Sequence, residues 1–202
     1  MKGLVFIPDI TGFTTFVSKV DIDSGVSITR ELLNEIIDNN HSGLMLSEIE
    51  GDALLFYKLG DPLPIRVVLG LFKQMSLAFR RKYQQLRLKY NVKASLSLKF
   101  ILHYGDIQVY CLKGFEKLYG VTLVESHCLL KNGFAGSDYL LITEDYIQAV
   151  DKQEDSKSII TWDISKRTSQ SFLNLREINY YFFDRLSKSS VHYDASSNTN
   201  VG

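Results

Sequence analysis

Apolar and polar positions along the chain follow strand-like spacing in some segments and helix-like spacing in others. Nearly every position of 3–8 is apolar, which predicts a central strand covered on both faces. A β-hairpin is predicted at 43–58, where two apolar-rich runs flank Glu50, Gly51 and Asp52. Glycine at the first turn position accepts positive φ, so we expect a type II′ turn through Gly51 and Asp52. Such a turn would hold the Asp52 carboxylate in one place.

Helical and strand-like periods alternate through the rest of the chain. Helices are predicted at 13–20, from an N-cap at Asp23-Ser24 to about 39–40, at 65–90, at 119–131 and at 144–150. Further strands are predicted at 96–102, 107–111, 139–143, 158–162 and 171–183, with a turn at 104–106 and a polar loop at 151–157. This order requires an α+β sandwich with a ferredoxin-like centre, in which helices pack on a mostly antiparallel sheet. We expect one domain over 1–186 and a disordered Ser/Asn-rich tail over 187–202.

The composition narrows the classes of function. Among 202 residues, 23 Lys and Arg balance 23 Asp and Glu, so no global charge favours nucleic acid or an anionic membrane as a partner. The two cysteines, Cys111 and Cys128, do not make a disulfide framework or a zinc site. No signal peptide and no apolar stretch of about 18 residues is present, so we expect a cytoplasmic protein without a membrane span.

Two acidic residues stand at positions that suit metal binding. The strand at 4–7 delivers Asp9 at its end, and Gly12 lets the backbone turn into the helix near Phe13. Asp9 and Asp52 are therefore expected at neighbouring strand ends beside a helix N-terminus. Paired carboxylates with backbone N–H groups are a standard means of holding Mg²⁺ and a triphosphate. The alternative is that one carboxylate caps the helix and the other decorates a turn.

These segments resemble two motifs of the class III nucleotidyl cyclases. Residues 6–14, Phe-Ile-Pro-Asp-Ile-Thr-Gly-Phe-Thr, resemble the first metal-site motif of that family. Residues 48–52, Glu-Ile-Glu-Gly-Asp, resemble the second, and the separation of the two also fits. Within this superfamily the chain is most similar to a bacterial group, the DUF2652 proteins, on its I-P-D-I-x-G-F-T, S-E-I-E-G-D-A and L-L-K-N stretches. The resemblance extends over about 3–146.

The resemblance implies a cofactor, a substrate and an assembly. It implies two Mg²⁺ or Mn²⁺ ions on Asp9 and Asp52, with the Ile10 carbonyl as an extra ligand. A nucleoside triphosphate would lie against Thr11, Gly12 and Phe13. The family converts such a substrate to a 3′,5′-cyclic nucleotide and pyrophosphate. Its homodimeric members take metals and base-reading residues from opposite protomers, so a homodimer is expected here.

The resemblance also places two base-reading residues. Glu48 matches the guanylyl version of the second motif, and alignment of the downstream motif places Lys117 at the second reader position. A carboxylate can accept from guanine N1–H and N2, and a lysine can donate to guanine O6, which adenine lacks. This pair would favour GTP over ATP. The competing interpretation is an ion pair that closes the pocket.

The transition-state residues depart from the family pattern. Where the family has G-[ND]-T-V-N-x-x-x-R, this chain has Val124 in place of Asn and Cys128 in place of Arg. Losing one preorganised donor costs about 10² to 10³ in rate, so turnover should be very low. Lys131, one helical turn further on, is a better candidate substitute than His127. Arg176 is the nearest counterpart of the third cation of the family, a Lys on a C-terminal strand.

Three functional hypotheses follow from these residues. The first is a cyclase-homology homodimer that binds metal and nucleotide, has little or no cyclase activity and serves in sensing or regulation. The second is an active, divergent purine-nucleotide cyclase in which Lys131 or another cation replaces the missing Arg. The third is a non-catalytic protein-interaction scaffold whose acidic site has no function.

Overall fold

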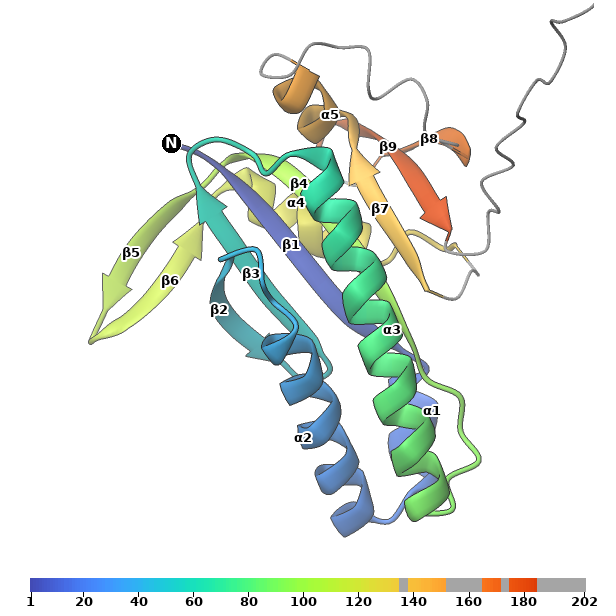
Figure 1. Cartoon of the computed structure of the whole chain (residues 1–202). Coiled ribbons are helices and arrows are strands. Elements are labelled where there is room, and N and C mark those ends of the chain that lie inside the picture. Colours follow the sequence, from blue (N-terminus) through green and yellow to red (C-terminus); the bar gives the residue numbers. More distant parts are fainter. Residues whose placement is uncertain (135–137, 152–164, 172–174, 185–202) are drawn as a thin grey trace, which may run out of the picture.

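The computed structural model describes residues 1–134, 138–151, 165–171 and 175–184 (Figure 1). The strands within these ranges are β1 (Lys2–Thr11), β2 (Met45–Glu50), β3 (Ala53–Leu59), β4 (Ser97–Asp106), β5 (Gln108–Leu112), β6 (Phe115–Tyr119), β7 (Tyr139–Thr143), β8 (Ser165–Ser171) and β9 (Glu177–Asp184). The helices are α1 (Phe13–Lys19), α2 (Ile22–Asp38), α3 (Ile65–Lys89), α4 (Val121–Leu129) and α5 (Glu144–Asp151). Seven strands form one sheet in the order β2-β3-β1-β4-β7-β9-β8, and β5 pairs only with β6.

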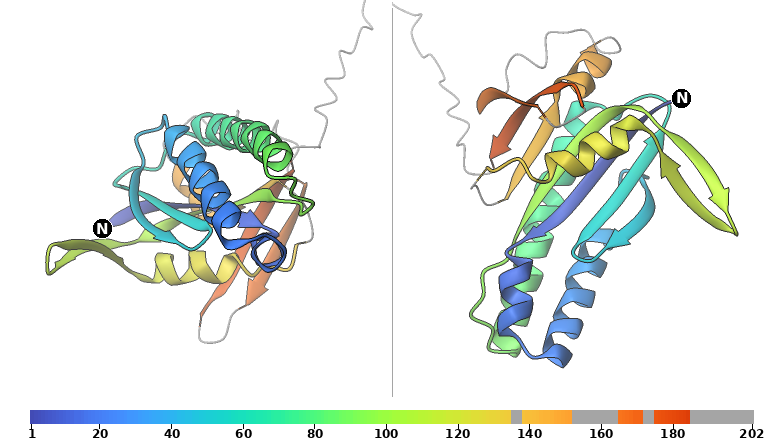
Figure 2. Two further views of the ribbon diagram at one scale, coloured as in Figure 1. Left: turned by 90° about the horizontal axis from the view of Figure 1, so that it is seen from below. Right: turned by 180° about the vertical axis from the view of Figure 1, so that it is seen from behind.

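The large sheet is mostly antiparallel, with β4 and β7 as its parallel pair. Helices α2 and α3 cover one face of the sheet, and α4 lies on the opposite face (Figure 2). This arrangement confirms the predicted α+β fold with helices packed on a mostly antiparallel sheet. No helix in the described ranges is long and apolar enough to cross a bilayer.

Strand β1 lies between β3 and β4, and its side chains supply two separate cores. Leu4 and Phe6 belong to the core under α2 and α3, and Val5 and Ile7 belong to the core on the α4 side. All four side chains are buried. Successive strand residues point to opposite faces, so a strand covered on both faces needs an unbroken apolar run. The prediction of a central first strand is confirmed.

The two-stranded β5–β6 hairpin projects away from the body beside the β2 edge of the sheet (Figure 1). Leu118 is buried at its base, whereas Phe115 and Tyr119 are 72% and 74% exposed. The sequence predicted the first strand of this hairpin at 107–111, which corresponds to β5, but it predicted no strand at 115–119 and began a helix at residue 119. That prediction was wrong at its start, because Gly120 ends the hairpin with φ near 150°, where a Cβ would collide with the Asp106 carbonyl oxygen.

Other boundaries also differ from the prediction. Helix α2 is capped by Asp21, whose Oδ1 accepts from Ser24 N at 2.9 Å, and not by Asp23-Ser24. Strand β4 runs through the predicted turn at 104–106, because β1 pairs with it as far as Asp106. The strand predicted at 171–183 corresponds mainly to β9; its first residue, Ser171, is the last residue of β8, and residues 172–174 lie outside the described residues. The predicted strand at 158–162, the loop residues 152–157 and the tail at 187–202 lie outside the described residues.

Candidate functional site

Asp9 and Asp52 lie side by side at one end of the central strands. Asp9 is directly opposite Ala53 in the β1–β3 ladder, so it lies next to the turn that carries Asp52. The Ile10 amide donates to the Asp52 carbonyl oxygen at 3.3 Å, which ties this turn to β1. Gly51, before Asp52, has φ near 63°, a conformation that glycine adopts without strain. The backbone ladder therefore fixes the separation of the two carboxylates.

A third charged residue, Lys99, completes this cluster. It lies directly opposite Asp9 in the β1–β4 ladder, and its Nζ is 2.8 Å from Asp9 Oδ2. The same Nζ donates to the Leu130 carbonyl oxygen at 3.0 Å. Burial, followed by the negative charge of Asp9, raises the pKa of Asp52 to about 6, although Lys99 opposes this rise. Lys99 was not among the predicted site residues, although a lysine within an alternating apolar strand is a visible signal.

The end of β1 after Asp9 supplies further oxygen atoms. Ile10 is buried, and the buried Thr11 Oγ1 has no hydrogen-bond partner within the described part of the chain. Gly12 has φ near 89° and precedes α1, which has only seven residues. A Cβ at Gly12 would lie 2.5 Å from the Ser95 carbonyl oxygen, so the chain must pass here without a side chain.

These donors fit a hard divalent cation. Two carboxylates, a backbone carbonyl and an unpaired hydroxyl are the oxygen ligands that Mg²⁺ and Mn²⁺ prefer. The described residues contain no cluster of three or more His, Cys, Asp or Glu side chains. Asp9 and Asp52 would hold a cation with few protein ligands, and water or phosphate oxygens would complete its coordination.

The structure also brings together the two predicted base readers. Glu48 on β2 and Lys117 on β6 form an ion pair, with Oε1 and Nζ 3.1 Å apart. The pair connects the sheet edge to the middle of β6 in the β5–β6 hairpin, and both side chains are partly exposed. This ion pair agrees with the interpretation that Glu48 and Lys117 close the base-binding pocket. It also keeps the two groups close enough together for one planar base to contact both.

Helix α4 presents no strong hydrogen-bond donor at the two positions that match the family's transition-state residues. Val124 is 52% exposed, and Cys128 is half-buried one turn later. Lys131 lies exposed beyond the end of the helix, where its amide donates to the Cys128 carbonyl oxygen at 3.0 Å. The adjacent His127 approaches Glu50, with Nδ1 and Oε2 3.6 Å apart.

The inner face of α4 is held by a buried polar network. Glu125 accepts from the Arg176 Nε at 2.8 Å, and its other oxygen is 2.7 Å from His103 Nε2. His103 Nδ1 is 2.8 Å from Thr143 Oγ1. Burial alone would raise the pKa of Glu125, but the hydrogen bonds and charges of His103 and Arg176 lower it to about 2. Arg176 also pairs with Asp145 at 2.8 Å, so its guanidinium is committed to two carboxylates.

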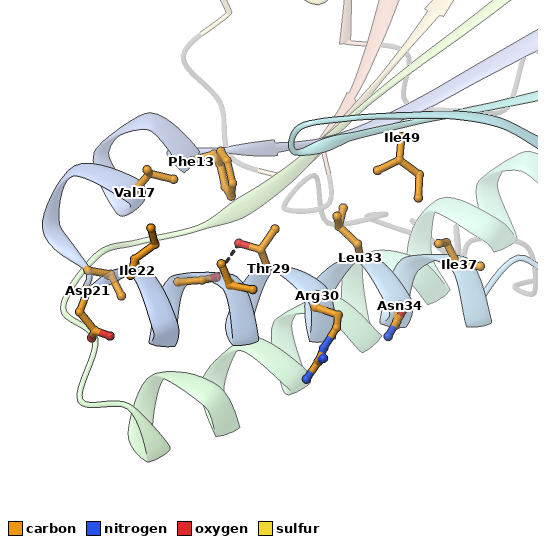
Figure 3. Close-up of a pocket in the computed structure, with 13 residues that line it drawn as sticks. Phe13, Val17, Asp21, Ile22, Thr29, Arg30, Leu33, Asn34, Ile37 and Ile49 are labelled. Carbon is orange, nitrogen blue, oxygen red and sulfur yellow. Dashed lines mark hydrogen bonds between the residues drawn. The ribbon is translucent and has the colours of Figure 1, made fainter.

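An apolar cavity of about 630 Å³ lies between α1, α2 and the turn end of β2 (Figure 3). Phe13, Val17 and Ile49 face Ile22 and Leu33 across it. Neither Asp9 nor Asp52 lines the cavity. Its apolar walls do not suit a triphosphate, which needs cations and N–H donors.

Solved nucleotidyl cyclases share this fold over nearly the whole chain. A guanylyl cyclase crystal structure superposes with a TM-score of 0.71, at 13% identity, and the match covers 90% of this chain and 91% of that chain. The adenylyl cyclase CyaB from P. aeruginosa superposes with a TM-score of 0.66, at 16% identity, with 91% and 94% covered. The guanylate cyclase domain of RhGC from Catenaria anguillulae, in complex with GTP, gives a TM-score of 0.57, at 14% identity, with 90% and 94% covered. At such identities the likeness shows the fold alone.

Sequence comparison identifies the family. An uncharacterized protein of Mycobacterium tuberculosis is 30% identical over 129 residues, which are 60% of this chain and 60% of that protein. The chain therefore spans about three fifths of this relative's length. The family described as "Protein of unknown function (DUF2652)" matches residues 29–139. This match covers more than half of the chain, which therefore belongs to the DUF2652 family and has the fold of the class III nucleotidyl cyclase domains.

Proposed function

We propose that this chain is a cyclase-homology protein that binds a divalent cation and a nucleoside triphosphate as a homodimer, with little or no cyclase activity. Its role would be nucleotide sensing or regulation. The observation that supports this most directly is the contrast between two parts of the site. Asp9 and Asp52 lie together on the sheet, whereas Val124 and Cys128 replace the donors on α4.

The acid pair supports cation binding. The raised pKa of Asp52 follows from burial and from the adjacent Asp9 charge, which a bound Mg²⁺ or Mn²⁺ would neutralise. Asp9 and Asp52 would hold the metal, with the Ile10 carbonyl as a further ligand. A bound cation supplies positive charge for the phosphate oxygens, and the Lys99 ammonium beside Asp9 adds to it.

The α4 surface argues against efficient catalysis. A valine side chain cannot donate a hydrogen bond, and a thiol is a weak donor. With both preorganised donors missing, a rate loss of more than about 10³ is expected even if the two effects are sub-additive. Arg176 cannot compensate while Glu125 and Asp145 hold its guanidinium.

The homodimer is supported by the exposed face of the β5–β6 hairpin. Tyr110, Leu112, Phe115 and Tyr119 are exposed large side chains on this two-stranded ribbon. In the β5–β6 register these residues belong to cross-strand pairs on one face. A lone two-stranded ribbon is marginally stable, and an apolar face of this kind is typical of protein interfaces.

The Glu48–Lys117 pair supports a preference for GTP. Its carboxylate and ammonium offer the acceptor and donor that guanine requires, and opening the ion pair would cost little because both groups are partly exposed. ATP presents neither the O6 acceptor nor the N2 donor, so its binding should be weaker.

The test is a thermal-melt titration of the full chain with Mn²⁺ and each of the four ribonucleoside triphosphates. A ligand at 100 times its Kd stabilises the folded state by about 2.7 kcal/mol. We expect a Mn²⁺-dependent rise in Tm with GTP above ATP, which Asp52→Asn abolishes. Asp106→Asn is the matched control, because that carboxylate is exposed and pairs with Lys2 at the other end of β4.

Two outcomes would favour the other hypotheses. A cyclic nucleotide product, found by mass spectrometry and lost in Asp52→Asn, would establish an active cyclase with a substitute cation such as Lys131. No change in Tm with any nucleotide would contradict nucleotide binding. The protein-interaction scaffold would then remain, and the exposed face of the β5–β6 hairpin is the observation that favours it.

A further inference from the structure

The Lys99 side chain is fixed within the acid pair and is not a mobile surface lysine. Its Nζ contacts two acceptors, Asp9 Oδ2 at 2.8 Å and the Leu130 carbonyl oxygen at 3.0 Å. The Lys99 side chain is 20% exposed and that of Asp9 is 14% exposed. Leu130 is the C-cap residue of α4, so its carbonyl lies at the negative end of the helix dipole. Both contacts stabilise an ammonium at this position.

The backbone holds Lys99 and Asp9 in register. The two residues face each other in the β1–β4 ladder, and Asp9 also faces Ala53 beside the Asp52 turn. The β1–β3 and β1–β4 ladders thus place the Asp52 turn, Asp9 and Lys99 in a row. Cross-strand neighbours have Cβ atoms only about 5 Å apart, so the ammonium cannot move far from Asp9 without leaving its second acceptor.

The net charge of Asp52, Asp9 and Lys99 suits one divalent cation but not two. Two carboxylates and one ammonium leave a single net negative charge, and Lys99 already occupies one oxygen of Asp9. In two-metal sites the ions lie about 3.5–4 Å apart and share carboxylate ligands. A second ion at Asp9 would have to approach the ammonium at similar range, where like charges repel.

We propose that the site holds one divalent cation per chain and that Lys99 takes the place of the second. This inference rests on the proposed metal binding at Asp9 and Asp52, and it departs from the two ions that the cyclase resemblance implies. For phosphate binding, the positive charge of Lys99 is then always present, whereas that of the divalent cation depends on the metal concentration.

The experiment is a Mn²⁺ titration of the metal-free full chain, without nucleotide, in which electron paramagnetic resonance measures free Mn²⁺. The variants are Lys99→Met, which removes the charge and keeps the apolar stem, and Lys99→Arg, which keeps the charge. Lys82→Met is the matched control, because Lys82 pairs with Glu31 and Glu35 on the α2–α3 surface. Far-UV circular dichroism verifies that each variant is folded, and Lys99→Gln replaces Lys99→Met if that variant unfolds.

We expect one Mn²⁺ per wild-type chain, and the same for Lys99→Arg and Lys82→Met. Removing the Lys99 charge should either add a second Mn²⁺ or tighten the first at least tenfold. Two Mn²⁺ per wild-type chain would overturn the inference and leave the proposed metal site standing. An unchanged titration in both Lys99→Met and Lys99→Gln would also overturn it. No Mn²⁺ on the wild-type chain would remove the proposed metal binding and this inference with it.

Discussion

Replacing Glu125 by Gln tests whether the buried network under α4 stabilises the fold by its charge. Glu125 is buried, and its two carboxylate oxygens accept from Arg176 Nε at 2.8 Å and from Arg176 Nη2 at 3.1 Å. His103 Nε2 lies 2.7 Å from Glu125 Oε2. Glutamine has nearly the same shape, so the substitution leaves no cavity. It removes the negative charge and directs an amide N–H₂ group toward groups that themselves donate.

The size of the effect follows from the pKa of Glu125. Its folded pKa is about 2, against an ordinary value of 4.5 in an unfolded chain. Each tenfold change in proton affinity corresponds to about 1.4 kcal/mol, so the ionised carboxylate stabilises the fold by about 3 kcal/mol at pH 7. This agrees with the range of about 3–5 kcal/mol for breaking a buried ion pair. We expect Glu125→Gln to lower the free energy of unfolding by about 3 kcal/mol.

The effect has a defined pH dependence. Because the folded pKa is the lower one, the stabilisation is complete above pH 4.5 and is lost as the pH falls toward 2. At pH 3.5 the unfolded carboxyl group is mostly protonated and the folded one is not. The wild-type advantage should then be smaller by roughly 1 kcal/mol than at pH 7.

Urea unfolding of both proteins at pH 7, 4.5 and 3.5 measures this difference. Other carboxyl groups titrate in both proteins and cancel. Glu116→Gln, at an exposed residue of β6, is the control and should change stability by less than about 0.5 kcal/mol at every pH. A cost below about 1 kcal/mol at pH 7, or a cost that does not shrink at pH 3.5, would refute the electrostatic reasoning.

Two further predictions concern the surface of the molecule. The double variant Val124→Asn with Cys128→Arg restores both donors and should raise cyclic nucleotide production from GTP and Mn²⁺ above the wild-type level, measured by mass spectrometry. No gain would mean that the base pocket or the protomer arrangement is also altered. Phe115→Ser should shift the proposed homodimer toward monomer in sedimentation velocity with little change in Tm, because this ring is exposed in the single chain. A dimer that persists unchanged would place the interface elsewhere.

The sequence predicted the fold where local spacing decides the structure. The apolar run of β1 and the two runs around Gly51 were recognisable because burial on both faces, or a tight turn, constrains residue types directly. Strand β6 was missed because Phe115–Tyr119 is short and adjoins a stretch with helical spacing. The parallel pairing of β4 with β7 depends on long-range packing, which no local pattern contains.

The candidate site, like the fold, was predictable only where local sequence decides the position of its residues. The adjacency of Asp9 and Asp52 followed from one strand end and one turn, and the structure brings the two residues together. Lys99 joins them through the register of β1 with β4, two strands far apart in sequence. The buried contacts of His103 had no local signal, because its partners Glu125 and Thr143 come from two other elements. Contacts of this kind need the tertiary structure.

The surface of α4 connects catalysis to assembly in a way that one variant can test. Val121 and Val124 are each about half exposed, and they follow the exposed Tyr119 of β6 in the sequence. If the homodimer buries this strip, Val124 contributes up to about 2 kcal/mol to association, which an asparagine would forfeit. Restoring the donors would then weaken the dimer that a shared site requires. The double variant should therefore show product formation that rises with protein concentration, since turnover would follow the dimer fraction. A rate per chain that is independent of protein concentration would show that the α4 surface is not part of the dimer interface.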